Sequence, residues 1–166
     1  MKYAVLFIMM LFLLGSCNSQ QTAAKQQAEA IKNAIAKTRP GTVATKEGSW
    51  SMTATINGKK WIASSVMPPE AAGRIIGYYK EEYIGLPYDK RNMVAGKKIK
   101  FGEDNAVDLS TSDDIGLWGG RKGEMEITKV NDNWAEGKFY FTGSTSRSDK
   151  TVEVTDGFFR IQLKAF

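Results

Sequence analysis

The chain of 166 residues contains no histidine and a single cysteine, Cys17. Without histidine, Ser-His-Asp and Cys-His catalysis are excluded, and so is the commonest zinc ligand. One cysteine can form no disulfide within the chain, so packing alone must hold a folded domain together. Gly-x-Ser-x-Gly, Ser-x-x-Lys, phosphate-loop and Gly-x-Gly-x-x-Gly motifs are also missing. We therefore expect a protein that is not an enzyme and that carries no cofactor and no metal ion.

Long hydrophobic segments are also scarce in this chain. Its longest apolar run, Ala4 to Leu14, is shorter than the roughly 20 residues of a membrane-spanning helix. Preceded by Lys2, this run fits the apolar core of a secretory signal peptide over residues 1–16. The residues that follow, Leu14-Gly15-Ser16-Cys17, resemble the lipobox of bacterial lipoproteins. The alternative is an ordinary secretory signal that happens to contain a cysteine.

The resemblance to bacterial lipoproteins implies that Cys17 receives a diacylglyceryl group, that the signal peptide is cleaved before it, and that its new amine is acylated. Because one acyl chain binds a membrane only reversibly, two or three chains are needed for stable anchoring. In such lipoproteins an aspartate after the cysteine directs retention in the inner membrane, whereas this chain has Asn18. We expect a protein that is anchored in the outer membrane and faces the periplasm. The alternative orientation, toward the cell surface, is not distinguished by the sequence.

The positive charge of the chain is concentrated near the expected anchor. Residues 18–46 carry five basic residues and one acidic residue, whereas residues 47–166 carry 17 of each. This balance removes the clustered positive charge that nucleic-acid binding requires, so we expect no nucleic-acid partner. A basic segment beside a lipid anchor is instead suited to anionic headgroups.

Residues 17–48 are interpreted as a lipidated tether that contains one helix. The segment 20–37 is rich in Ala, Gln and Lys and lacks Gly and Pro, which favours a helix. Arg39-Pro40-Gly41 ends this helix because proline cannot continue it.

The pattern from residue 49 to residue 166 predicts a single all-β domain. Apolar and polar residues alternate over 50–56, and Asn57-Gly58 then predicts a type I′ hairpin. Asp156-Gly157 is a second hairpin signal of the same kind. About ten short strands without intervening helices predict antiparallel sheets closed as a β-sandwich or a small barrel. Two smaller expectations are a helical turn that starts at Pro69 and a break in the strands at Gly119-Gly120.

Three segments of this domain resemble uncharacterised β-rich bacterial lipoproteins. They are residues 52–61, 136–141 and 154–159, which read MTATINGKKW, EGKFYF and VTDGFF. The resemblance implies a lipid-anchored β domain in the cell envelope and no known activity.

Aromatic residues provide the candidate binding site. Four of the six tyrosines fall within eleven residues, and one tryptophan precedes Gly119-Gly120-Arg121. Tyrosine and tryptophan combine an apolar body with a polar tip, which suits contacts with glycans or peptides. The alternative is that these residues are ordinary strand formers. The candidate ligand-binding residues are Tyr78, Tyr79, Tyr83, Tyr88, Trp118 and Arg121.

The favoured function is a non-catalytic binding or assembly module of the envelope that contacts a glycan, a lipid or a protein. The alternative is a structural accessory subunit of an envelope complex. A carboxylate-based hydrolase is less favoured, because pairs such as Glu124 and Glu126 are better explained as solvated strand faces. A binding module should place the tyrosines or Trp118 along a cleft, whereas an accessory subunit should show a flat exposed apolar patch.

Overall fold

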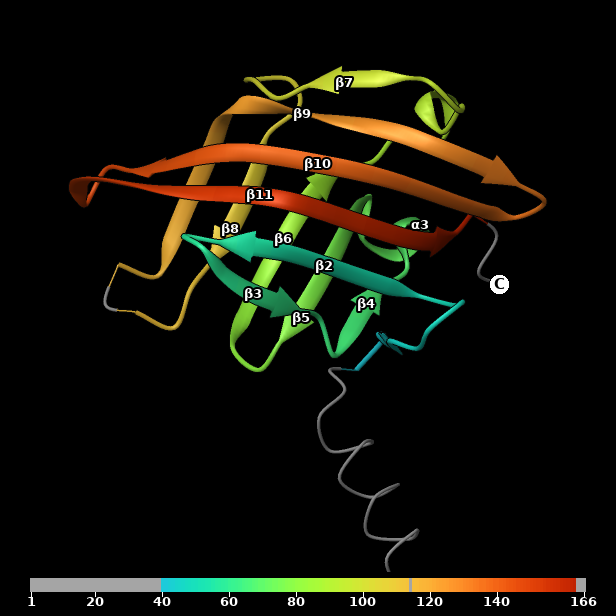
Figure 1. Ribbon diagram of the computed structural model, residues 1–166, viewed down its shortest axis with the longest axis horizontal. Coiled ribbons are helices and arrows are strands. Elements are labelled where there is room, and N and C mark those ends of the chain that lie inside the picture. Colours follow the sequence, from blue (N-terminus) through green and yellow to red (C-terminus); the bar gives the residue numbers. More distant parts are fainter. Residues whose placement is uncertain (1–39, 114, 164–166) are drawn as a thin grey trace, which may run out of the picture. The chain divides into compact units, whose positions relative to one another are not determined.

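A computed structural model describes residues 40–113 and 115–163, which belong to one compact unit, Thr38–Phe166 (Figure 1). The expected signal peptide, the lipidated Cys17 and the tether helix lie outside the described residues. Within the described part, no helix has the length and apolar character needed to cross a membrane.

Eleven strands and two short helical turns make up the described chain. In chain order they are β1 (Val43–Ala44), β2 (Ser51–Ile56), β3 (Lys59–Ile62), β4 (Ser65–Met67), α3 (Pro69–Ala72), β5 (Arg74–Tyr79), β6 (Glu82–Pro87), the 3-10 turn η1 (Lys90–Asn92), β7 (Lys98–Lys100), β8 (Val107–Ser110), β9 (Leu117–Asn131), β10 (Trp134–Thr145) and β11 (Ser148–Gln162).

All of these strands belong to one antiparallel sheet in the order β1-β4-β5-β6-β8-β9-β10-β11-β2-β3, with β7 paired to β9. The sheet curls strongly into a half-barrel, so that the long strands β9 to β11 pass across β5, β6 and β8 (Figure 1). Strand β2 also contacts β4, which brings the two ends of the sheet near each other. The prediction of an antiparallel all-β fold is confirmed, and one curled sheet takes the place of two packed ones.

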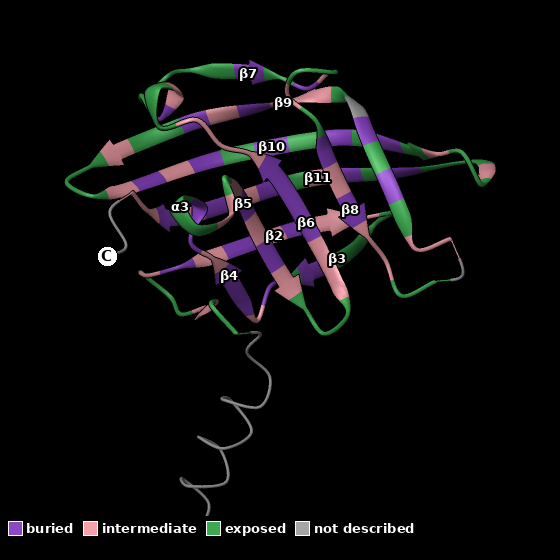
Figure 2. Cartoon of the chain, turned by 180° about the vertical axis from the view of Figure 1, so that it is seen from behind, coloured by how far each residue is buried: buried purple, intermediate pink, exposed green. Residues whose placement is uncertain are grey.

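The core fills the concave side of this sheet. Buried and exposed residues alternate along β10 and β11, as strands with one covered face require (Figure 2). Aromatic side chains supply much of the buried volume, and those that are at most 6% exposed are Trp50, Trp61, Phe101, Trp118, Phe139, Phe141 and Phe159.

Glycines and β-bulges allow the long strands to bend around this core. A Cβ at Gly120 would lie 2.5 Å from Cγ1 of Val107 and 2.7 Å from Cδ2 of Phe141. The pairing of β10 shifts register on both sides, including between Thr142 and Gly143, where β10 meets β9. Because each bulge adds local twist and bends its strand, the bulges along β10 produce the curl.

The first hairpin prediction is confirmed and the second is wrong. Asn57 and Gly58 join β2 to β3 with φ angles of 47° and 76°, as a type I′ turn requires. Asp156 also has a positive φ of 50°, but Gly157 does not, and β11 continues through both residues. The register of β11 against β2 shifts between Thr155 and Phe158, so this segment forms a bulge and not a turn.

The expected break at Gly119-Gly120 is also wrong, because β9 runs through both residues. There β9 pairs with β8, whereas further along it pairs with β7 through Glu124 to Glu126. The helical turn expected at Pro69 is confirmed as α3, which ends at Gly73 in a left-handed conformation.

We predict that Gly120→Ala destabilises the domain by about 1–3 kcal/mol, because the new Cβ would overlap Val107 and Phe141 in the core. Gly102→Ala is the matched control, since a Cβ at Gly102 meets no atom within 4 Å. Chemical denaturation of both variants measures the effect. Equal free energies of unfolding for the two variants would contradict this view of the curl.

Candidate functional site

The four clustered tyrosines do not form one site. Tyr78 and Tyr79 are consecutive in β5, so their side chains leave opposite faces of the sheet. Tyr78 lies opposite Tyr83 of β6, with ring centroids 6.0 Å apart and ring planes tilted by 54°. The structure therefore brings two of the four together and separates Tyr79 and Tyr88 from them.

An ion pair lies beside Tyr83 on the face of β5, β6 and β8. Arg74 of β5 pairs with Asp108 of β8 across Gly85, where a Cβ would crowd both side chains. The same guanidinium donates to the carbonyl oxygens of Gly85 at 2.9 Å and Ala106 at 3.0 Å. Burial, followed by the charge of Asp108 and a hydrogen bond to it, raises the pKa of Tyr83 to about 12. These contacts tie three strands together and give the cluster a structural role.

Tyr88 joins the segment after β6 to α3. Its hydroxyl donates to Oε1 of Glu70 at 3.2 Å. Burial, followed by the nearby Glu70 carboxylate, raises the pKa of Tyr88 to about 12.

Trp118 is part of the core and not of a surface cleft. Its side chain is 3% exposed, and its indole N–H donates to Oγ1 of Thr111 at 2.9 Å. Arg121 belongs to β9, but its side chain lies outside the described residues.

Tyr79 lines a hollow of about 430 Å³ between β3 and the β5–β6 hairpin, which we call the strand-edge hollow. Strand β3 ends the sheet, and within the described residues no strand pairs with its outer edge (Figure 1). Tyr79 is 40% exposed and Ile62 is 50% exposed. The lining residues are Ile56, Lys59, Lys60, Trp61, Ile62, Tyr79, Glu82 and Thr111.

Trp61 of β3 carries an unusual donor. Its side chain is only 5% exposed, yet its indole N–H has no hydrogen-bond partner among the described residues. A buried tryptophan usually finds a partner for this group, as Trp118 does with Thr111. Trp61 therefore lines the hollow with its ring, while its unpaired N–H lies buried with almost no accessible surface.

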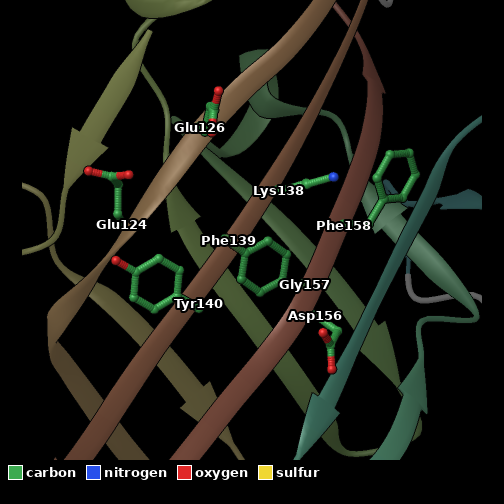
Figure 3. A pocket seen from close by; sticks show the side chains of 8 residues that line it. All are labelled: Glu124, Glu126, Lys138, Phe139, Tyr140, Asp156, Gly157 and Phe158. Carbon is green, nitrogen blue, oxygen red and sulfur yellow. The ribbon is translucent and has the colours of Figure 1, made fainter. Parts of the chain in front are cut away.

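A second hollow of about 440 Å³, the sheet-face hollow, lies over β9, β10 and β11 (Figure 3). Carboxylates from two strands line it, namely Glu124 and Glu126 of β9 and Asp156 of β11. Nζ of Lys98 lies 3.5 Å from Oε1 of Glu124 and 3.9 Å from Oε2 of Glu126. The remaining lining residues are Lys138, Phe139, Tyr140, Gly157 and Phe158, of which Tyr140 is 56% exposed.

Sequence reasoning did not select Trp61, Ile62 or Tyr140 as site residues. Ile62 and Tyr140 nevertheless break the alternation of their strands, because each is a large apolar residue at a solvent-facing position. That pattern is visible in the sequence once the strand phase is known. The unsatisfied N–H of Trp61 is visible only in the folded chain.

We predict that tyrosine ionisation weakens the fold above pH 10. Tyr83 and Tyr88 have pKa values raised from 10.0 to about 12, so the unfolded chain loses these protons first. Their stabilising contribution is complete below about pH 10 and is lost as the pH rises toward about 12. Urea denaturation at a series of pH values should show a shallower decline for Tyr83→Phe than for the unchanged chain. An identical decline would contradict the prediction.

Comparisons with models of protein families, with curated proteins and with solved structures gave no match.

Proposed function

We propose that this chain is a lipid-anchored protein of the bacterial cell envelope whose β domain is a non-catalytic binding module. The observation that carries the binding role is the strand-edge hollow. Its volume falls within the range of small-molecule sites, and its lining is half apolar or aromatic residues and half charged or polar ones. Ligands of that kind of site have an apolar body and a polar end.

The sequence at the N-terminus supports the anchor. The lipobox-like Leu14-Gly15-Ser16-Cys17 follows an apolar run that is too short to span a membrane. Acylation of Cys17 would hold the chain at a bilayer, and the basic residues within 18–46 would favour an anionic surface. An outer-membrane location facing the periplasm is part of the same proposal.

The distribution of exposed apolar side chains favours a binding module over an accessory subunit. Ile62 and Tyr79 come from different hairpins and meet at the strand-edge hollow. The other large exposed apolar residues lie on separate segments: Val94 after η1, Leu117 at the start of β9 and Tyr140 on β10. This pattern supports one apolar hollow better than a single flat docking patch.

The carboxylates of the sheet-face hollow give little support to a hydrolase. Lys98 lies between Glu124 and Glu126, and the side chains of Lys98 and Glu126 are 59% and 42% exposed. Both carboxylates pair with this one lysine, and with side-chain exposures of 19% for Glu124 and 42% for Glu126 the group is typical of an ion-pair cluster on a strand face.

We predict that the mature chain begins at an acylated Cys17. Mass spectrometry of the N-terminal peptide from membrane fractions should show a diacylglyceryl group on this residue. Cys17→Ser should abolish the modification, because Cys17 is the only thiol in the sequence. An unmodified Cys17 in membrane-derived protein would contradict the anchor.

We also predict that the strand-edge hollow binds a neutral apolar dye such as Nile red. Ile62→Gln should weaken binding about fivefold, because the half-exposed side chain contributes about 1 kcal/mol of apolar contact. Tyr140→Gln is the matched control, since Tyr140 is similarly exposed but lies on the sheet face. The assay uses the mature chain, residues 17–166, with Cys17→Ser, so that neither an acyl group nor the apolar run Ala4 to Leu14 competes for the dye. Absence of binding, or equal loss in both variants, would overturn the proposal.

A further inference from the structure

The charge lining the strand-edge hollow is unbalanced. Two lysines, Lys59 and Lys60, and one glutamate, Glu82, contribute to the lining. Oε1 of Glu82 already accepts a hydrogen bond from Oγ of Ser112 at 2.8 Å. Among the residues that the structure describes, neither lysine forms an ion pair with an acidic side chain. The hollow therefore presents more positive than negative charge to an occupant.

The hydrogen-bonding groups of the two lysines point the same way. A lysine ammonium carries donors and no acceptor. Within the described residues Lys59 and Lys60 have no carboxylate partner, so an oxygen atom of a ligand would supply the acceptor. The unpaired N–H of Trp61 has almost no accessible surface and is not counted among the contacts of a ligand.

The apolar part of the lining sets the other end of the ligand. Ile56 and Ile62 come from the two strands of the first hairpin, and Tyr79 comes from the end of β5. Ile62 and Tyr79 are substantially exposed where they line the hollow. Covering these side chains with an apolar body would remove their surface from water.

We propose that the strand-edge hollow binds a single-chain amphiphilic anion, with its apolar body against Ile56, Ile62 and Tyr79 and its acid group at the outer edge of β3, which Lys59 and Lys60 flank from its two faces. This inference rests on the proposed binding function and names the class of ligand. Bulk anions without an apolar body would lack the apolar contact, and amphiphilic cations would be repelled by the two lysines.

The test compares ligands that share one chain and differ in charge. The mature chain, residues 17–166, with Cys17→Ser is titrated with decanoate, decanamide and decyltrimethylammonium below their micelle concentrations, with acetate as the control without an apolar body. Displacement of Nile red reports binding. Decanoate should bind most tightly, and the double variant Lys59→Gln/Lys60→Gln should lower its affinity about tenfold relative to that of decanamide. Lys138→Gln, on the sheet face, should leave the affinity for decanoate unchanged.

Both lysine side chains are exposed, so the double variant should keep a cooperative unfolding transition, and its affinities therefore decide the question.

Four results would overturn the inference while leaving the hollow as a binding site. The first is equal affinity for the three decyl compounds, and the second is binding of acetate as tight as that of decanoate. The third is an unchanged preference for decanoate in the double lysine variant. The fourth is lysine-dependent binding to phosphatidylglycerol vesicles without binding of free decanoate. The last result would assign the lysines to a bilayer surface. Failure of Nile red and of all the decyl compounds to bind would instead overturn the proposed function itself.

Discussion

Close packing across glycines in the three longest strands is the constraint on which this structure depends. Gly120 lets Val107 and Phe141 approach the backbone of β9. Gly143 lets Val152 of β11 approach the backbone of β10. A side chain at either position would occupy space that the core fills, so glycine is required there. The bulges along β10 supply the twist that accompanies the bend of the strands.

The curl brings the ends of the sheet near each other without pairing them, and the strand-edge hollow follows from that. Strand β3 keeps an outer edge without a strand partner in the described structure, and the β5–β6 hairpin lies across the hollow from it. Lysines on an edge strand also discourage pairing with a second chain, so Lys59 and Lys60 have a role in solubility even without a ligand. A ligand site at this edge would use the same two lysines that discourage pairing with a second chain.

The tyrosine-rich segment shows why clustering in sequence is a weak guide to a site. Consecutive strand residues face opposite sides of the sheet, so the side chains of Tyr78 and Tyr79 lie on different faces of β5. The hairpin register places Tyr83 opposite Tyr78, whereas Tyr79 lines the strand-edge hollow. Strand periodicity alone predicts this division, whereas the burial of Trp118 and the exposure of Ile62 depend on which face the distant strands cover.

The sequence by itself determined the antiparallel β class, the Asn57-Gly58 hairpin and the helical turn at Pro69, because each depends on local periodicity or on backbone angles of neighbouring residues. Only the tertiary structure decided that Asp156-Gly157 is a bulge and that β9 continues through Gly119-Gly120. A dipeptide with turn propensity stays extended when long strands on both sides pair with it, since the hydrogen bonds and core contacts of the whole sheet outweigh a local preference. The hollow at β3 is likewise a property of the curled sheet, because its lining comes from β2, β3, the β5–β6 hairpin and Thr111, which are brought together only by folding.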